Sequence, residues 1–151
     1  MTRDLVTMAI THFDWFQFIF LQNFNHMKLI NRVPDDSGIL LLSVGRFTDE
    51  EKHLENGRSQ ADFSKTVKLG GGTIGCDRTG LEAWHQAYYA TMRSYLKRDL
   101  FAGKDQNMMA TCCLETDLCL LLNSDLNNWF KLQDWLIGNL PNENYQRLSL
   151  S

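Results

Sequence analysis

The stretch KTVKLGGGTIGCDRTGLEAWHQAYYATMRSYL, residues Lys65 to Leu96, decides how the middle of this chain folds. A strand-like run at 65–69, with Val67 and Leu69 apolar, is followed by three glycines, then by two other residues and a fourth glycine. From about Thr79, apolar side chains recur every three or four residues, which is the spacing of one face of an α-helix. We therefore expect a strand at 65–69, a glycine-rich turn, and a helix from about Thr79 to Arg98.

Similar patterns on either side predict the remaining elements. Short apolar runs bounded by polar turns are typical of buried strands. Thr48 and Glu51 have the spacing of a helix capping box, and Gly57 is placed to end that helix. Strands and helices alternate, so the sequence predicts an α/β fold with a mixed sheet flanked by helices. The expected elements are strands at 38–47 and 118–123 and helices at 48–57, 104–115 and 129–140.

The composition is that of one globular domain. A length of 151 residues predicts a single domain spanning 1–151. The net charge is −3 and the basic residues are scattered, so we expect no nucleic-acid binding, which needs a concentrated positive surface. The apolar N-terminal run is interrupted by His12, Asp14 and Gln17. We therefore expect neither a signal peptide nor a membrane span there.

The same N-terminal run is unusually aromatic. Two interpretations stay open: a strand or helix that covers a core, or a surface for a partner or for a missing part of the domain. The six aromatic residues are Phe13, Trp15, Phe16, Phe18, Phe20 and Phe24.

The cysteines do not form a recognisable metal-binding pattern. They contain no C-x-x-C pair, and no histidine lies beyond His85 to complete a zinc site. We expect small buried thiols in a reducing compartment and hence a cytoplasmic protein. The four are Cys76, Cys112, Cys113 and Cys119.

The glycine run formally fits the G-x-G-x-x-G pattern of dinucleotide-binding proteins. In that fold the helix begins at the second glycine, whereas here Cys76 to Arg78 intervene before Thr79. No Lys-Ser/Thr pair follows the glycines, so a P-loop is excluded. Two interpretations stay open: a tight turn between strand and helix, or a backbone that a bulky polar ligand approaches closely.

A second element, LFAGKDQNMM at 100–109, bears on this choice. Lys104, Asp105 and Gln106 stand at the expected start of a helix. Asp105 is therefore a candidate helix cap. The pair Asp105–Gln106 also places a hydrogen-bond acceptor beside an amide that both donates and accepts, which suits sugar hydroxyls.

Taken together, LGGGTIG, WHQAYYATMRSYL and FAGKDQNMM resemble the C-terminal part of a GT-A-type glycosyltransferase of the HtrL/YibB-like family, with a distant similarity to glycogenin-type enzymes. The resemblance spans about 39–122 and implies transfer of a sugar from a nucleotide-sugar donor to an unknown acceptor. It implies that Asp105 and Gln106 contact sugar hydroxyls or the reacting centre as catalytic residues. The residues that it implies to bind substrate are Gly70, Gly71, Gly72, Thr73 and Lys104.

The chain departs from that family in its donor site. The family holds its nucleotide on an N-terminal half, where an Asp-x-Asp motif binds Mn²⁺ or Mg²⁺; this chain has no Asp-x-Asp and no metal-ligand set. Asp35–Asp36 comes closest, but before Ser-Gly it is typical of a turn. We therefore expect a domain that lacks its nucleotide-binding half. Three hypotheses stay open: a truncated glycosyltransferase, a non-catalytic sugar-binding or interaction module, and an α/β protein without sugar chemistry.

Overall fold

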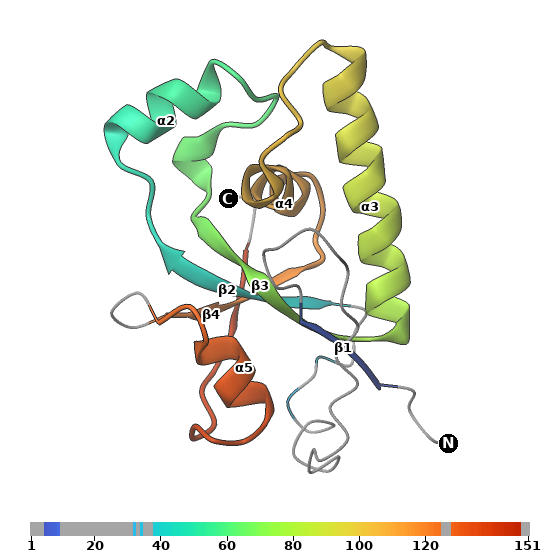
Figure 1. Ribbon diagram of the computed structural model, residues 1–151, viewed down its shortest axis with the longest axis vertical. Coiled ribbons are helices and arrows are strands. Elements are labelled where there is room, and N and C mark those ends of the chain that lie inside the picture. The colour runs from blue at the N-terminus through green and yellow to red at the C-terminus, as the bar shows by residue number, and fades with distance from the viewer. Residues whose placement is uncertain (1–4, 10–31, 33, 35–37, 125–127, 149–151) are drawn as a thin grey trace.

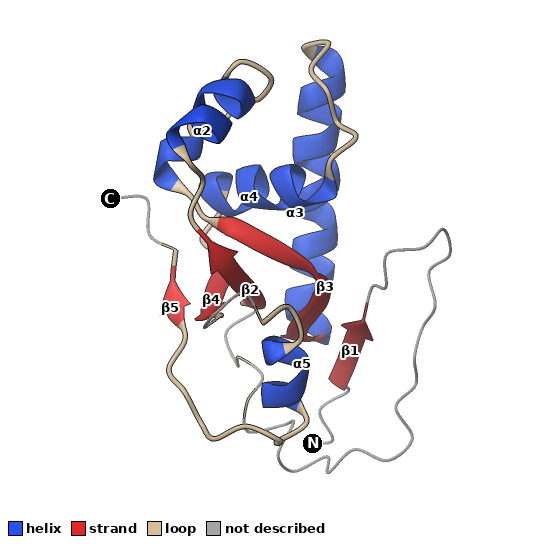
Figure 2. Cartoon of the chain, turned by 60° about the vertical axis from the view of Figure 1, so that its left-hand side comes forward, coloured by secondary structure: helices blue, strands red, loops and turns tan. Residues whose placement is uncertain are grey.

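The computed structural model describes residues 5–9, 32, 34, 38–124 and 128–148. Within them a five-stranded sheet has the order β1-β3-β2-β4-β5 (Figures 1 and 2). β2 and β4 are parallel, and every other neighbouring pair is antiparallel. The predicted α/β fold with a mixed sheet is therefore confirmed. The strands are β1 (Leu5–Ala9), β2 (Ile39–Gly45), β3 (Lys68–Asp77), β4 (Cys119–Asn123) and β5 (Gln146–Arg147).

Helices cover both faces of the sheet. The long α3 and the central α4 lie on one face and the short α5 lies on the other (Figure 1). Successive residues of β2 alternate between the two cores: Ile39 packs on the α3 and α4 side, and Leu40 on the α5 side. The helices are α2 (Asp49–Asn56), α3 (Arg78–Lys97), α4 (Asp105–Glu115) and α5 (Lys131–Leu136), with a 3₁₀ turn, η1, at Phe63–Lys65.

The glycine run lies inside β3, so the prediction of a turn at these residues is wrong. β3 continues to Asp77 because its other edge pairs with β1, a strand that the sequence patterns did not identify. Leu42 pairs with Gly70 and Leu40 pairs with Gly75, so the single residue Leu41 stands opposite four residues of β3. The extra residues form a bulge, a distortion that glycine accommodates readily.

The helix boundaries follow local capping chemistry. Thr48 and Glu51 form the predicted capping box: the Glu51 N–H donates to Thr48 Oγ1 at 3.2 Å, and the Thr48 N–H donates to Glu51 Oε2 at 2.7 Å. The cap of α3 is Asp77, not Thr79, because its carboxylate accepts from the Gly80 N–H at 2.7 Å.

Cys113 and Cys119 form a disulfide, so the prediction of four free thiols is wrong. The loop between α4 and β4 brings their α-carbons to 5.4 Å, a proximity that the six-residue separation alone does not reveal. Cys76 and Cys112 are free and buried. Burial raises the pKa of each of these thiols to about 12.

Two sequence features lie outside the described residues: the aromatic segment at 13–24 and the pair Asp35–Asp36. None of the helices in the described ranges is long and apolar enough to cross a membrane.

Candidate functional site

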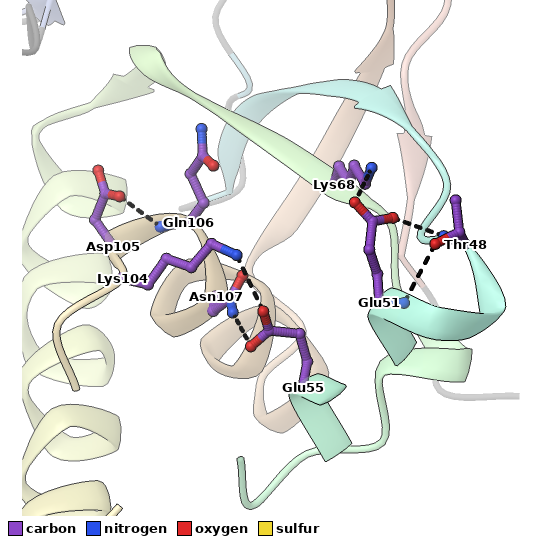
Figure 3. A network of polar contacts seen from close by, with 8 residues as sticks. All are labelled: Thr48, Glu51, Glu55, Lys68, Lys104, Asp105, Gln106 and Asn107. Atoms are coloured by element: carbon purple, nitrogen blue, oxygen red, sulfur yellow. Dashed lines mark hydrogen bonds and ion pairs between the residues drawn. The ribbon is translucent and has the colours of Figure 1, made fainter. Parts of the chain in front are cut away.

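Gly71 brings β3 against the first turn of α4. A Cβ added at Gly71 would lie 3.2 Å from Asp105 Oδ2 and 3.7 Å from Gln106 Cγ. Figure 3 shows Gln106 rising from α4 towards β3 and Asp105 lying on the side of α3. Of the glycines predicted to bind substrate, Gly71 is therefore the one that the structure places beside both predicted catalytic residues. Any side chain at this position would press on the carboxylate.

Asp105 does not act as an ordinary helix cap. The cap position of α4 is Lys104, whose side chain makes no capping hydrogen bond. Asp105 is the first helical residue, and its Oδ1 accepts from the Gln106 backbone N–H at 2.8 Å. Its Oδ2 accepts no hydrogen bond from any other described residue and faces Gly71. One carboxylate oxygen is thus held in place while the second remains available to a ligand.

Gln106 has free hydrogen-bonding capacity next to this oxygen. The residue is half-buried, and its side-chain amide makes no hydrogen bond within the described part of the chain. An amide supplies two N–H donors and a carbonyl acceptor. Together with Asp105 Oδ2 it can therefore both give hydrogen bonds to a polyol and accept them from it.

Tyr88 of α3 packs against the core and lies near enough to Asp105 to be affected by its charge, and the sequence did not indicate it as a site residue. Burial raises the pKa of its phenol, and the negative charge of Asp105 raises it further. Its ring lies 5.9 Å from Trp84 and 6.0 Å from Tyr89, between centroids. The spacing of the aromatic residues on α3 predicted that they pack in the core. That spacing does not distinguish Tyr88 from the other aromatic residues of the helix.

Lys104 is directed away from the glycines. Its ammonium donates to Glu55 Oε1 on α2 at 3.0 Å. The other oxygen of Glu55 accepts from the Asn107 side-chain amide (Figure 3). Lys104 therefore forms an ion pair with Glu55. Glu55 lies next to the candidate site, although no local sequence pattern indicated it.

The other predicted residues of β3 are dispersed. A Cβ at Gly70 would meet Val44 and Leu42 on the α5 side of the sheet, the face opposite to Asp105. Gly72 is exposed and Thr73 is buried. Hence the structure does not bring Gly70 to Asp105–Gln106, because neighbouring residues of a strand face opposite ways.

The site is a poor match for a divalent cation. Calcium takes six to eight oxygen ligands, whereas Asp105 and Gln106 offer one carboxylate and one amide oxygen. Across the described ranges, no group of three or more histidine, cysteine, aspartate or glutamate side chains could hold a metal ion. Asp105 and Gln106 alone therefore do not form a site for such an ion.

A separate hollow of about 430 Å³ lies where the end of α2 meets the loop between α3 and α4. Its lining contains none of the residues predicted to bind substrate or to act in catalysis. The residues that form it are Gly57, Arg58, Asp99, Leu100 and Phe101.

Comparison with known proteins adds no assignment: no protein-family model matches the chain, and neither a curated protein nor a solved structure is significantly similar to it.

Proposed function

We propose that this chain is a glycosyltransferase-like domain that binds a sugar across Gly71, Asp105 and Gln106, and that its activity is transfer of that sugar from a nucleotide donor. The observation that carries the proposal is the 3.2 Å approach of a Gly71 Cβ position to Asp105 Oδ2. It joins two sequence elements, 34 positions apart, that resemble the sugar site of such enzymes.

The side chains present suit a sugar. The free oxygen of Asp105 can accept a hydrogen bond from one hydroxyl, while the Gln106 amide can donate to one sugar hydroxyl and accept from another. Gly71 and Asp105 are almost in contact, so a sugar would lie beside this pair and not between the two residues. Gly71 has no side chain, so its backbone is open to close approach by the ring.

A role in transfer follows from the free carboxylate oxygen. An acceptor hydroxyl that hydrogen-bonds to Asp105 Oδ2 loses its proton to that oxygen as it attacks the anomeric carbon, and the nucleoside diphosphate leaves with the bonding electrons. Gln106 holds the sugar in position during this step.

The test is stabilisation by ligands. Native-state binding raises the melting temperature, so we would screen UDP- and GDP-hexoses with and without Mn²⁺. We expect at least one donor to stabilise the wild type, and Asp105→Asn to abolish the effect. Asp117→Asn is the matched control, because Asp117 is an exposed aspartate in the loop that follows the other end of α4. The absence of stabilisation by every donor would contradict the proposal.

The second candidate is a non-catalytic sugar-binding module. It is favoured by the single carboxylate of the site, which falls short of the clustered acids of a metal-dependent donor site. Free hexoses would then shift the melting temperature as much as the nucleotide sugars do, and Mn²⁺ would have no effect. A simple loss of stability in Asp105→Ala, with no ligand bound by the wild type, would favour a structural role for Asp105.

A further inference from the structure

Helix α2 is attached to the rest of the protein by polar contacts and not by an apolar face. Of its eight residues, Glu55 is the one that is buried, while Leu54 is exposed. Most helices of a globular domain bury an apolar stripe. A helix whose buried side chain is a carboxylate must be held by the groups that pair with that carboxylate.

Two acids on one face of α2 reach the two halves of the proposed site. Glu51 and Glu55 are four positions apart and so lie on the same side of the helix. The Glu51 carboxylate accepts from the Lys68 ammonium at 2.6 Å, and Lys68 is the first residue of β3, three positions before Gly71. The Glu55 carboxylate accepts from Lys104 at 3.0 Å.

The contacts of Glu55 flank the predicted catalytic pair. One oxygen pairs with Lys104, directly before Asp105, and the other with the side chain of Asn107, directly after Gln106. The Glu55 side chain is 10% exposed and that of Lys104 is 51% exposed, so solvent and salt reach the ion pair from the Lys104 side, whereas the bond to Asn107 is buried. Figure 3 shows both acids of α2 directed at these partners.

We propose that α2 is a clamp that sets the distance between Gly71 and Asp105, with Glu51 and Glu55 as positioning residues for the sugar site. The identity of the ligand rests on the proposed function. The role of α2 in holding β3 and α4 together does not. Glu51 holds the start of the glycine strand, Glu55 holds the first turn of α4, and the rigid helix between them fixes the two parts relative to each other.

The test combines amide hydrogen exchange with ligand binding in the complete chain. Glu55→Gln keeps the size of the side chain but replaces one of its two acceptors by a donor. We expect exchange of the amides of Gln106 to Met108 to become about tenfold faster, the effect of losing one charge-assisted hydrogen bond. Lys68→Met, which spares the capping box, should accelerate exchange at the start of β3.

Two controls separate positioning from general stability. Glu50→Gln changes an exposed acid of the same helix that makes no contact with the site. Thr91→Val removes the bond from Thr91 Oγ1 to Glu115 Oε2, at 2.9 Å, far from the first turn of α4. Neither should accelerate exchange at 106–108, and neither should weaken binding of the UDP- or GDP-hexose that stabilises the wild type. Glu55→Gln should weaken that binding about tenfold.

Unchanged exchange at 106–108 in Glu55→Gln would overturn the clamp, as would an affinity loss in Thr91→Val equal to that in Glu55→Gln. Failure of the wild type to bind any nucleotide sugar would contradict the proposed function instead. The exchange measurements on the unliganded protein would still decide whether α2 holds β3 and α4 together.

Discussion

The ammonium of Lys104 donates to the Glu55 carboxylate at 3.0 Å, although the two residues are 49 positions apart. This ion pair changes the composition of the candidate site. Lys104, which by resemblance would contact the substrate, instead fastens the start of α4 to α2. Of the residues proposed to bind a sugar, this leaves Asp105, Gln106 and the backbone at Gly71 at the site.

Enlarging Gly71 should block the site. A Cβ there meets Asp105 Oδ2 at 3.2 Å, so Gly71→Ala requires a small displacement, whereas the branched side chain of Gly71→Val must push the carboxylate aside. We expect Gly71→Val to lose about 1–3 kcal/mol of unfolding free energy and to abolish binding of nucleotide sugars. Calorimetric titration and urea unfolding measure the two effects.

Gly57→Ala is the control for that substitution. Gly57 has φ −72° and a Cβ there would make only an ordinary contact, 3.5 Å from the Leu54 carbonyl. Gly57→Ala should leave binding of nucleotide sugars unchanged and raise the free energy of unfolding by up to about 1 kcal/mol. Wild-type affinity in Gly71→Val would show that no ligand lies at this backbone.

Removing the disulfide should destabilise the protein. Closing the short loop between Cys113 and Cys119 restricts the unfolded chain, so Cys113→Ala/Cys119→Ala should lose roughly 2–3 kcal/mol. A reducing agent should lower the melting temperature of the wild type but not that of the double variant. Thiol titration of the unfolded, unreduced wild type should find two free cysteines, Cys76 and Cys112. A count of four would contradict the bond.

Glu51 should make stability depend on acidity. Hydrogen bonds from Lys68 and from the Thr48 backbone lower the pKa of its carboxyl from 4.5 to about 2. Because the pKa is lower in the folded state, the ionised Glu51 carboxylate stabilises that state fully above pH 4.5, and this stabilisation is lost as the pH falls towards 2. The difference in melting temperature between the wild type and Glu51→Gln should therefore shrink across that range. A constant difference from pH 7 to pH 2 would be inconsistent with this ion pair.

A buried hydroxyl cluster should support the junction of α3 and α4. Tyr95 is 1% exposed, and its hydroxyl lies 2.6 Å from Thr111 Oγ1 and within hydrogen-bonding distance of Ser59. Tyr95→Phe should lose about 1–2 kcal/mol in urea unfolding. Tyr89→Phe, which alters a partly exposed tyrosine of the same helix, should change stability far less. Equal losses in the two variants would contradict a role for the cluster.

Local patterns predicted much of the fold. The apolar run of β2, the capping box of α2 and the periodicity of α3 depend on neighbouring residues, and each element was found within a few positions of its prediction. The extension of β3 through the glycines depends instead on pairing with β1 and β2, which no local pattern contains. The same holds for the disulfide, whose two cysteines meet only after α4 and β4 have packed.

The candidate site divides in the same way. Asp105 and Gln106 were predicted from their place at a helix start and from the family resemblance, and Gly71 from the glycine run. A turn carries no prediction of which side each glycine faces. In the strand that is present, successive residues face opposite sides of the sheet, so Gly70 faces α5 and Gly71 faces α4. The burial of Glu55 could not be predicted, because an acid in a short polar helix is expected to be exposed. Its partners Lys104 and Asn107 are 49 and 52 positions away in the sequence.

The most direct test of the proposed sugar site is a titration of ¹⁵N-labelled protein, followed by NMR, with the nucleotide sugar that gives the largest thermal shift. If a sugar binds there, amide shifts should concentrate at Gly71, Gly72 and Gln106 and vanish in Gly71→Val. Shifts confined to the hollow at Gly57 and Phe101, or shifts that persist unchanged in Gly71→Val, would contradict it.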